Sequence, residues 1–570
     1  MSYFSGYQTQ GSLLIKKHKE GTMKRKVLKS LVSIGMASAL LLTACGGSTA
    51  SSDSSTVASK EEAVADTAAE ETNAASKETA QSGSTEIVKL RFFNDETWWP
   101  YTVWEGRIPE KISEETGVTF EVTTAADSTA LNLMIASGDL GDLILTSDNA
   151  KISRLQNSDM CYTLDELAQM AGEESFDVHP VLRLVNTADD GNLYTIMCGY
   201  SPDYYMKEYP KAVYETTGLV VRDDMYEAIG SPVVKNLDDF EAMLATVKEK
   251  YPDVVPFMYN YTHTNGIIKM LLGSDVGIGG FLDVDGHAKA FIEDPVLEDY
   301  YELMNDWYLK GYMTDENFAF TSDSDDSDYM AAGKLYALAK YSNTADEMGV
   351  TLTEAGCDYG LVQLTDIIAN QPGAKHLQTT AGWRGMFVPK SCADPVAAYN
   401  FMKFMYSEDG QCLSLWGEEG VDWNWDEEHS YPVLNYDFES PNEADGMKFW
   451  GWIYHDGVRN TLPGYGNEGQ TFKAREAATA ISETNPVLGM LRMGADSEEQ
   501  TIMNNLVELY NNMTAQIITA STPEASKALY QEMLTTAQSM GVDKLDNWAD
   551  SKYAEKKAAY DEIKDIGADY

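Results

Sequence analysis

Hydrophobic and polar positions follow the pattern of an α/β protein from residue 87 onward. IVKLRFF (87–93) has the alternation of a β-strand, and VTFEVTT (118–124) repeats it after a helical stretch, IPEKISEETG. A second helical stretch, STALNLMIASG, leads to the strand-like DLILTS, which ends at Ser147. Strands that alternate with helices of about ten residues indicate βαβ units and a mostly parallel sheet.

Similar patterns continue through the second half of the chain. GLVVR (218–222) and GKLYALA (333–339) are typical of buried strands, and FLDVDGHAKAFIED (281–294) is typical of a hairpin. NLDDFEAMLATVKEKYP (236–252) predicts a helix with an Asn cap, acidic residues in its first turn and a proline after its end. The C-terminal part is predicted to be mainly helical. Because 570 residues exceed one ordinary core, we expect two lobes.

The first 86 residues lack these patterns. From Met23, the segment MKRKVLKSLVSIGMASALLLTACGGS has a basic head, a short apolar run and small residues before Cys45, which is the layout of a secretory signal. Its apolar run is too short for a membrane-spanning helix. Residues 1–44 are therefore a predicted signal peptide. Translation is expected to begin at Met23, because the preceding KEGT can be encoded by a purine-rich ribosome-binding sequence. Residues 45–86 hold no aromatic residue and are predicted to be a disordered tether.

The chain is strongly acidic, with a formal net charge of −48. Without residues 1–44, which hold seven basic residues and one acidic residue, the charge is more negative still. Such a surface repels phosphate backbones and anionic lipids, so nucleic acid is excluded as a partner and a neutral or cationic ligand is favoured.

The cysteines after Cys45 are odd in number and form no C-x-x-C pair, so they are expected to be buried thiols and not a disulfide framework. They are Cys161, Cys198, Cys357, Cys392 and Cys412. The seven histidines form no H-x-H or H-E-x-x-H pair, which leaves catalytic zinc without support. SDSDDSD (322–328) lacks the glycine and the final glutamate of an EF-hand loop and is expected to be a solvated loop. No metal, nucleotide or redox cofactor is expected.

Several segments in order resemble the extracellular solute-binding lipoproteins (family 1) of carbohydrate-type ABC importers. Leu42-Thr43-Ala44-Cys45 is similar to a lipobox. The other segments are ETGV with LNLMIASGDLGDLIL, GNLYTI, GLVVRDDMYEAIGSPVVKNLDDF, WYLKGYMTDENF and WRGMFVPKSCADPVAAYNFMKFMYSEDGQCLSLWGEEGVDW. They cover nearly the whole mature chain, although Gly141 stands where the family usually has proline.

The resemblance implies an exported protein that is lipidated at Cys45 and anchored to the outer face of the cytoplasmic membrane. It implies an α/β, two-lobed, periplasmic-binding-protein-like (type II) fold with a central ligand cleft and three hinge crossings. The implied N-terminal lobe comprises 87–198 plus 335–385, and the C-terminal lobe comprises 199–334 plus 386–570. The implied function is that of a monomeric, non-enzymatic receptor. It captures a carbohydrate, which the charge suggests is a neutral oligosaccharide, and delivers it to a separate membrane permease.

Aromatic residues supply the flat, rigid faces on which sugars stack, and the chain has 11 Trp and 33 Tyr. NDETWWPYTVW (94–104) follows the first strand directly, where ligands bind in such sheets. We expect its acids to bind hydroxyls and one or two of its rings to line the cleft, while the other rings pack beneath the next helix. Trp383 and Arg384 resemble the family's returning hinge segment. The candidate ligand-binding residues are Asp95, Glu96, Trp98, Trp99, Tyr205, Trp383, Arg384 and Trp423.

Two further tryptophan expectations concern the second half of the chain. Trp423 and Trp425 are expected to point to opposite sides of an extended segment, so that at most one lines the cleft. Trp307 is expected in the core of a helix.

Two alternative functions remain open at this point. A peptide-binding receptor of the same fold would offer fixed groups for a peptide backbone in place of stacked indoles. A glycan-processing enzyme would need two carboxylates at a separation of about 5–10 Å. Glu418, Glu419, Asp422 and Asp426 form one local acidic cluster of that kind.

Overall fold

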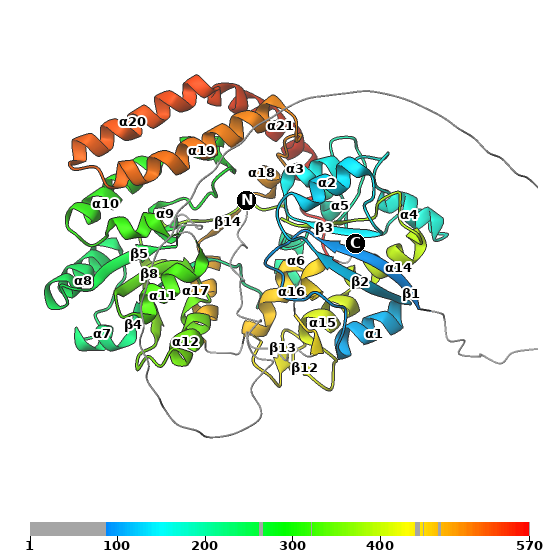
Figure 1. Cartoon of the computed structure of the whole chain (residues 1–570), viewed down its shortest axis with the longest axis horizontal. Helices are drawn as coiled ribbons and strands as arrows, with labels where there is room; N and C mark the ends of the chain where they lie inside the picture. Colours follow the sequence, from blue (N-terminus) through cyan, green and yellow to red (C-terminus); the bar gives the residue numbers. More distant parts are fainter. Residues whose placement is uncertain are drawn as a thin grey trace, which may run out of the picture. The chain divides into compact units, whose positions relative to one another are not determined.

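A computed structural model describes residues 87–260, 266–320, 322–438, 445–448, 450–465 and 469–568. The predicted signal peptide (1–44) and tether (45–86) lie outside these residues. The first sheet has the strand order β11-β3-β1-β2, in which β1 runs parallel to β2 and β3 while β11 is antiparallel to β3 (Figure 1). Its strands are β1 (Val88–Asn94), β2 (Val118–Thr124), β3 (Leu143–Thr146) and β11 (Gly385–Phe387).

Helices cover both faces of this first sheet. Leu143 and Leu145 of β3 pack into one hydrophobic core with α1, while Ile144 between them packs into a second core with α2 and α3. A strand buried on both faces needs a continuous apolar run, which LILT supplies. We call this sheet and its helices the first lobe. The helices are α1 (Arg107–Thr116), α2 (Ala130–Ser137), α3 (Asn149–Leu155), α4 (Leu164–Met170), α5 (Pro180–Asn186), α14 (Pro395–Tyr406) and α15 (Glu408–Trp416).

Local sequence explains how the first helix packs and where the first two helices end. Helix α1 buries Ile108 and Ile112, which lie four residues apart on one face. It stops at Gly117, whose φ of 70° is left-handed. Helix α2 stops at Gly138, whose φ of 76° is the left-handed conformation typical of a glycine cap.

The second sheet has the order β5-β8-β4-β9 and is mixed: β5 runs parallel to β8, and β4 is antiparallel to both β8 and β9. We call this sheet and its helices the second lobe. Its strands are β4 (Thr217–Arg222), β5 (Val255–Tyr259), β8 (Leu335–Tyr341) and β9 (Leu361–Gln363). Its helices are α7 (Asp223–Ala228), α8 (Leu237–Lys250), α9 (Gly266–Leu272), α10 (Leu297–Leu309), α11 (Asp323–Ala331), α12 (Thr344–Glu354), α13 (Asp366–Asn370) and α17 (Gln470–Thr479).

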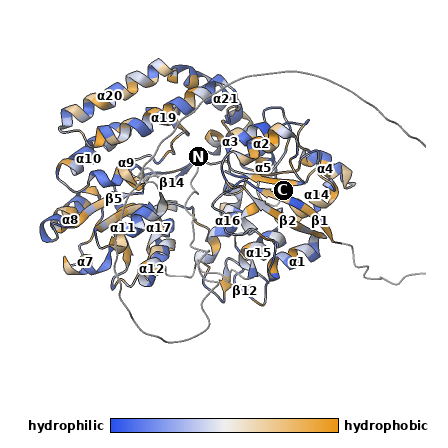
Figure 2. Cartoon of the chain, viewed as in Figure 1, coloured by the Kyte–Doolittle hydropathy of each residue, from blue (hydrophilic) through white to orange (hydrophobic). Residues whose placement is uncertain are grey.

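A hairpin and three long helices extend the second lobe. The hairpin, β6 (Phe281–Val284) and β7 (His287–Ala290), turns at Asp285-Gly286 as predicted. Helices α19 (Glu498–Ile518) and α20 (Pro523–Met540) pack on α10, and α21 (Val542–Ile563) follows them. Figure 2 shows polar and apolar residues alternating along α19 and α20, as expected of amphipathic helices.

The strand pairing differs from the predicted division into lobes. Residues 335–385 were expected in the N-terminal lobe, but β8 and β9 pair with β4 in the second sheet. Residues 386–570 were expected in the C-terminal lobe, but α14 and α15 pack against α1 in the first lobe. The physical reason is that β8 inserts between β4 and β5, a long-range pairing that sequence periodicity does not encode.

The prediction that SDSDDSD (322–328) is a solvated loop is wrong, because residues 323–331 form α11. Ser322 and Asp325 form a capping box at its start. Acidic residues near a helix N-terminus stabilise the helix, because they interact favourably with the positive end of its dipole. Asp326 is fully buried and accepts hydrogen bonds from Asn260 (2.7 Å) and Lys340 (3.0 Å).

The predictions for the cysteines and for Trp307 are confirmed. All five cysteines among the described residues are free thiols, and four of them are buried, with Cys357 half-buried. Trp307 lies fully buried in α10, between the rings of Phe240 and Phe257.

The chain passes between the two lobes three times. The first crossing runs from Cys198 to β4 and contains α6 (Asp203–Glu208). The second runs from β9 to β11 through β10 (His376–Gln378). The third runs from the short 3-10 helix η5 (Trp450–Ile453), which packs on α15, through α16 (Gly457–Thr461) to α17. The short strand β14 (Ser482–Thr484) pairs in parallel with β10, and α18 (Pro486–Gly489) follows it. The predicted two-lobed fold with three crossings is therefore confirmed.

A buried histidine ties the first two crossings to the second lobe. Nδ1 of His376 lies 2.6 Å from a carboxylate oxygen of Asp275, and Nε2 lies 2.9 Å from the carbonyl oxygen of Glu215. Burial alone would lower the pKa of His376, but the Asp275 carboxylate outweighs it and raises the pKa above the usual 6.5.

We therefore expect the His376–Asp275 pair to stabilise the fold most at acidic pH. A histidine whose folded pKa is raised contributes stability that is fully present below its unfolded pKa and is lost as pH rises through the folded value. The melting temperatures of the wild type and His376→Gln, measured from pH 5.5 to pH 8.5, should differ most at the acidic end. A difference that stays constant across this range would contradict the prediction.

Candidate ligand-binding site

The loop after β1 is fixed at its base by a buried ion pair. The backbone N–H of Asp95 donates to the carbonyl oxygen of Leu145 in β3 (2.9 Å), so the loop starts at the carboxyl edge of the sheet. One carboxylate oxygen of Asp95 accepts from Nζ of Lys151 (2.7 Å) and from the hydroxyl of Thr146 (2.8 Å). Burial raises the pKa of Asp95, and these two partners partly offset the rise.

Three tryptophans surround the guanidinium of Arg384. Its Cζ lies 4.7 Å from the ring centre of Trp99, 4.5 Å from that of Trp383 and 5.9 Å from that of Trp98. The rings of Trp98 and Trp383 stack with 6.4 Å between their centres. We call these four residues the tryptophan box. It joins the loop after β1 to the end of the second crossing.

Two polar side chains in and beside the box have unused hydrogen-bonding groups. Arg384 is fully buried and donates to the carbonyl oxygen of Trp452, yet its Nε and Nη1 find no acceptor among the described residues. Glu96 accepts from Nε1 of Trp98 (3.0 Å) through Oε2, and its Oε1 is likewise unpartnered within the described chain. Buried polar groups are normally paired, so these atoms are candidates for contact with a ligand.

Backbone hydrogen bonds hold the three crossings together beneath the box. The N–H of Cys198 donates to the carbonyl oxygen of Arg384 (2.9 Å), and the N–H of Trp383 donates back to that of Cys198 (3.1 Å). The N–H of Gly199 donates to the carbonyl oxygen of His455 in the third crossing segment (3.0 Å). Gly199 has a left-handed φ of 80°, and a Cβ there would lie 2.7 Å from the Trp383 ring, so only glycine fits.

His455 lies buried next to this junction as a neutral imidazole. Burial lowers its pKa to about 3, and the positive charge of Arg384 adds to the shift. A small cavity of about 30 Å³ borders His455 and is also lined by Tyr200, Tyr205 and Tyr454. Its size suits a bound water and excludes a sugar ring.

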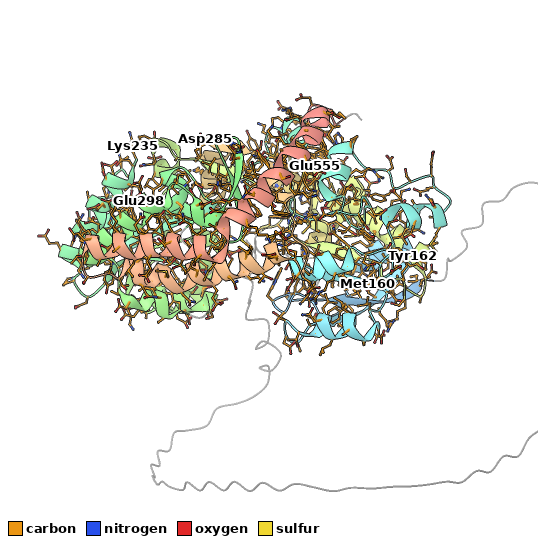
Figure 3. All side chains as sticks on the ribbon, turned by 90° about the horizontal axis from the view of Figure 1, so that it is seen from above. Met160, Tyr162, Lys235, Asp285, Glu298 and Glu555 are labelled. Carbon is orange, nitrogen blue, oxygen red and sulfur yellow. The ribbon has the colours of Figure 1, made fainter. Side chains whose placement is uncertain are left out.

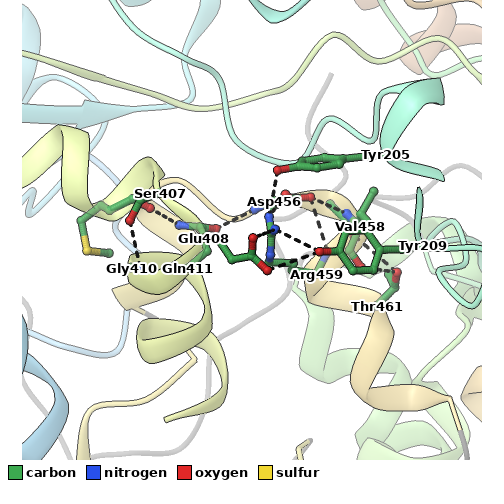
Figure 4. Close-up of polar contacts among 12 residues, drawn as sticks. Tyr205, Tyr209, Ser407, Glu408, Gly410, Gln411, Asp456, Val458, Arg459 and Thr461 are labelled. Carbon is green, nitrogen blue, oxygen red and sulfur yellow. Dashed lines mark hydrogen bonds and ion pairs between the residues drawn. The ribbon is translucent and has the colours of Figure 1, made fainter. Parts of the chain in front are cut away.

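Tyr205 belongs to a polar network centred on Arg459 (Figure 4). The Arg459 guanidinium donates to Asp456 (2.7 Å) and to the hydroxyl of Tyr205 (3.2 Å), and it lies 3.4 Å from Glu408. Burial raises the pKa of Asp456, whereas the Asp456 carboxylate raises the pKa of Arg459 despite its burial. The network connects α6, α15 and α16, and Tyr209 continues it toward the ring of Trp425.

Trp423 and Trp425 lie on a hairpin, β12 (Trp423–Trp425) with β13 (Pro432–Leu434). The expectation that the two rings point to opposite sides is wrong. Both rings contact Trp416, because residues two apart in a strand face the same side. Trp423 is buried and donates to the carbonyl oxygen of Gly417 (2.9 Å), which places it apart from the tryptophan box. Trp425 is the half-buried ring of the pair.

Other rings of the opening cluster support the loop. Trp104 is buried beneath α1, where its Nε1 donates to the carbonyl oxygen of Pro109 (3.1 Å) and to the Ser113 hydroxyl (2.9 Å). Tyr101 stacks on Trp450, with 5.8 Å between ring centres. Of the eight candidates, the structure brings Trp98, Trp99, Trp383 and Arg384 together and places Glu96 beside Trp98. It places Asp95 at the base of the same loop and Tyr205 in the neighbouring network.

Sequence reasoning missed the contribution of FWGWIYH (449–455). Trp450 packs on the rings of Trp99 and Trp104, Trp452 supplies the carbonyl oxygen to Arg384, and His455 supports Gly199. The signal was available, because this stretch is denser in aromatic residues than NDETWWPYTVW. Its position in the third crossing segment was not apparent from the sequence.

Two members of the acidic cluster considered for glycoside hydrolysis, Glu418 and Asp422, form ion pairs with cations. Asp422 accepts from Nη2 of Arg107 (2.8 Å), and Glu418 accepts from Nζ of Lys111 (3.0 Å). Arg107 also contacts Glu418 (3.4 Å). A glycosidase needs two carboxyl groups that are free to act on the substrate, whereas these two are held in ion pairs. Within the described ranges, no group of three or more His, Cys, Asp or Glu side chains is arranged to hold a metal ion.

We expect the buried Asp95–Lys151 pair to be essential for the stability of the first lobe. Lys151→Met leaves an uncompensated carboxylate and should cost about 3–5 kcal/mol of unfolding free energy, measured by urea denaturation. The double variant Asp95→Asn/Lys151→Met should recover much of this loss. Lys89→Met, which breaks the exposed pair of Lys89 with Glu121 (3.4 Å), is the matched control and should cost close to nothing. Equal losses in Lys151→Met and Lys89→Met would refute the prediction.

No helix of the described ranges combines the length and the hydropathy that a membrane crossing requires. The comparison with curated proteins finds no match. Solved structures with the same fold include the alginate-binding protein AlgQ2 without calcium ion, at a TM-score of 0.58 and 16% identity, covering 83% of this chain and 99% of that chain.

Two further structures have slightly lower TM-scores. One is an HMO-binding, ABC-transporter-associated solute-binding protein from Bifidobacterium longum infantis, with a TM-score of 0.56, 13% identity and coverage of 82% of this chain and 98% of that chain. The other is the S. pneumoniae ABC-transporter substrate-binding protein FusA in complex with kestose, with a TM-score of 0.56, 15% identity and coverage of 83% and 100%.

Residues 108–413, more than half of the chain, match the model of the bacterial extracellular solute-binding protein family. A member of this family is an exported binding protein and not an enzyme. The chain belongs to the bacterial extracellular solute-binding protein family.

Proposed function

We propose that the protein captures a neutral oligosaccharide between its two lobes and delivers it to an ABC permease in the membrane. The tryptophan box carries this proposal. It presents indole faces beside a buried arginine whose Nε and Nη1 lack acceptors in the described chain. Sugars need this combination of apolar faces and fixed polar groups. The similar structures, described as alginate-binding, HMO-binding and in complex with kestose, support a carbohydrate ligand.

The energetics suit such a ligand. Stacking one ring on a sugar removes roughly 100 Å² of apolar surface from water and gains about 2.5 kcal/mol before the costs of binding. Two or three ring contacts with a few hydrogen bonds can therefore supply the roughly −8 kcal/mol of micromolar affinity. In this proposal Trp98, Trp99 and Trp383 stack on the ligand, while Glu96 and Arg384 bind its hydroxyls. Asp95 positions the loop, since its charge is already paired with Lys151.

Ligand capture would work through the three crossings. A ligand held by groups from both sides of the crossings favours the lobe arrangement in which those groups converge, and it stabilises that arrangement by its differential affinity. The permease would then recognise the closed lobes. The ATPase of such an importer is a separate polypeptide, so no nucleotide site is required in this chain.

We expect Trp383→Ala to weaken oligosaccharide binding by roughly 10- to 100-fold, the loss of one stacked ring. The measurement is isothermal titration calorimetry of the delipidated protein against a panel of neutral oligosaccharides. Trp383→Phe keeps a flat ring and should lose less affinity than Trp383→Ala, which separates ring stacking from a general disturbance of the crossing.

Three outcomes of this titration would count against the proposal. Binding of peptides without binding of any sugar would favour a peptide receptor. Hydrolysis of an oligosaccharide during the titration would favour an enzyme. Equal affinity of the wild type and Trp383→Ala for a bound sugar would move the binding site away from the tryptophan box.

We also propose that the mature protein is tethered to the outer face of the membrane by a lipid on Cys45. The support is the lipobox-like sequence LTAC and the aromatic-free segment after it, both outside the described residues. In cells fed labelled palmitate, Cys45→Ser should abolish incorporation and move the protein from the detergent phase to the aqueous phase. Cys357→Ser is the control and should keep the label. Continued labelling of Cys45→Ser would contradict the anchor.

A further inference from the structure

The C-terminal helix α21 contacts both lobes along its length. Its first half lies on the β6–β7 hairpin of the second lobe. There Asp546 accepts from the backbone N–H of Ala290 (2.9 Å) and from Nζ of Lys289 (2.9 Å), and the Tyr553 hydroxyl donates to Asp283 (2.6 Å). Figure 3 labels Asp285 in the turn of this hairpin and Glu555 on α21, at the end of this contact.

The second half of α21 lies on the first lobe. It packs along α5, which Arg183 fixes to Asp165 of α4 (2.9 Å). Nζ of Lys556 lies 3.8 Å from the carboxylate of Asp189 in the loop after α5. Tyr560 is buried beside Tyr200 at the start of the first crossing.

The chain beyond the last residue of α21 makes a further contact with the first lobe. The carbonyl oxygen of Gly567 lies 3.1 Å from Nε2 of His179, at the start of α5. One continuous stretch, from Val542 to Gly567, is therefore attached to both lobes without being one of the three crossings.

The two attachments differ in strength. In the second lobe, the Asp546 side chain is 5% exposed and accepts two hydrogen bonds of ordinary length. In the first lobe, the one ion pair that the structure shows between α21 and the loop after α5 is long, and its Asp189 side chain is 64% exposed. Such pairs contribute little and can break at small cost. The ion pairing of the first-lobe attachment is therefore the weaker of the two.

We propose that α21 is a strap that ties the lobes together outside the crossings, and that its attachment to α5 and Asp189 sets how far the lobes can separate. A helix of this length is stiff, so a change in the angle between the lobes must slide or release one of its ends. The second-lobe end stays fixed through Asp546 and Tyr553. The first-lobe end slides, and its contacts favour the lobe arrangement seen here.

The test measures the distance between the lobes in the ligand-free protein, so it does not depend on the identity of the solute. Spin labels on the exposed positions Glu121→Cys in β2 and Glu249→Cys in α8 report this distance by double electron–electron resonance. The half-buried Cys357 is replaced by serine in all samples to prevent its labelling. The variants Lys556→Gln and Asp189→Lys each break the long ion pair from one side.

Each of these two variants should change the ratio of lobe arrangements by roughly two- to fivefold, the range of a partly exposed ion pair. The exchange variant Lys556→Asp/Asp189→Lys should restore the wild-type distribution, which a merely structural disturbance of the helix would not do. Lys557→Gln is the matched control. Lys557 is the neighbouring lysine and pairs within α21 with Asp561 (2.7 Å), so its loss should leave the distances unchanged.

Distances that are the same in all variants would overturn the strap. A change in Lys557→Gln as large as that in Lys556→Gln would overturn it as well, because the effect would then come from helix charge. The two proposals can fail separately. If the protein bound no oligosaccharide, the distances in the ligand-free protein would be unaffected. If the strap proposal were wrong, the calorimetric titrations would be unaffected.

Discussion

The buried guanidinium of Arg384 is the constraint on which the site depends. A buried charge without an ion pair is costly unless other groups compensate it. Within the described chain the compensation comes from the indole faces of Trp99 and Trp383 and from the carbonyl oxygen of Trp452. These groups belong to three segments that lie far apart in the sequence. The charge can be buried only when all three have reached their final places, so the site and the junction of the crossings form together.

The neighbourhood of the box is close to electrically neutral, although the chain as a whole carries −48. Asp95 is balanced by Lys151, and Asp456 is balanced by Arg459. His455 stays uncharged because burial keeps its pKa near 3. An uncharged interior in an acidic protein suits a solute that is recognised by shape and hydroxyl groups and not by charge.

Many helices and strands could be predicted from local sequence, because short-range patterns and caps determine where they form. The alternation in 87–93, the glycine after α2 and the Asn cap of α8 specify elements by short-range rules, and each element formed as expected. The division into lobes failed because β8 inserts between β4 and β5. The periodicity of a strand shows that it is buried, but it does not show which sheet receives it.

The candidate site was predictable to the same extent: single residues could be proposed from the sequence, but not which distant segments meet. Trp98, Trp99 and Trp383 could be proposed from composition and from a family resemblance, and they meet around Arg384. The role of FWGWIYH could not be inferred, since a core residue and a site residue have the same composition. Trp423 shows the reverse case, in which an aromatic residue in a suitable stretch is used to pack a hairpin. Only the contact of the third crossing segment with Arg384 and Gly199 distinguishes a residue of the candidate site from a residue that packs the core.

Gly199 has a consequence for how such a site can change during evolution. The Trp383 ring lies against a backbone that has no side chain, so its orientation is set by the first crossing as well as by its own rotamer. The rings of the tryptophan box and the glycine that makes room for Trp383 therefore belong to different segments. Under the proposed function, an exchange of rings in the loop after β1 that keeps the junction of the crossings would give a new ligand preference on an unchanged hinge.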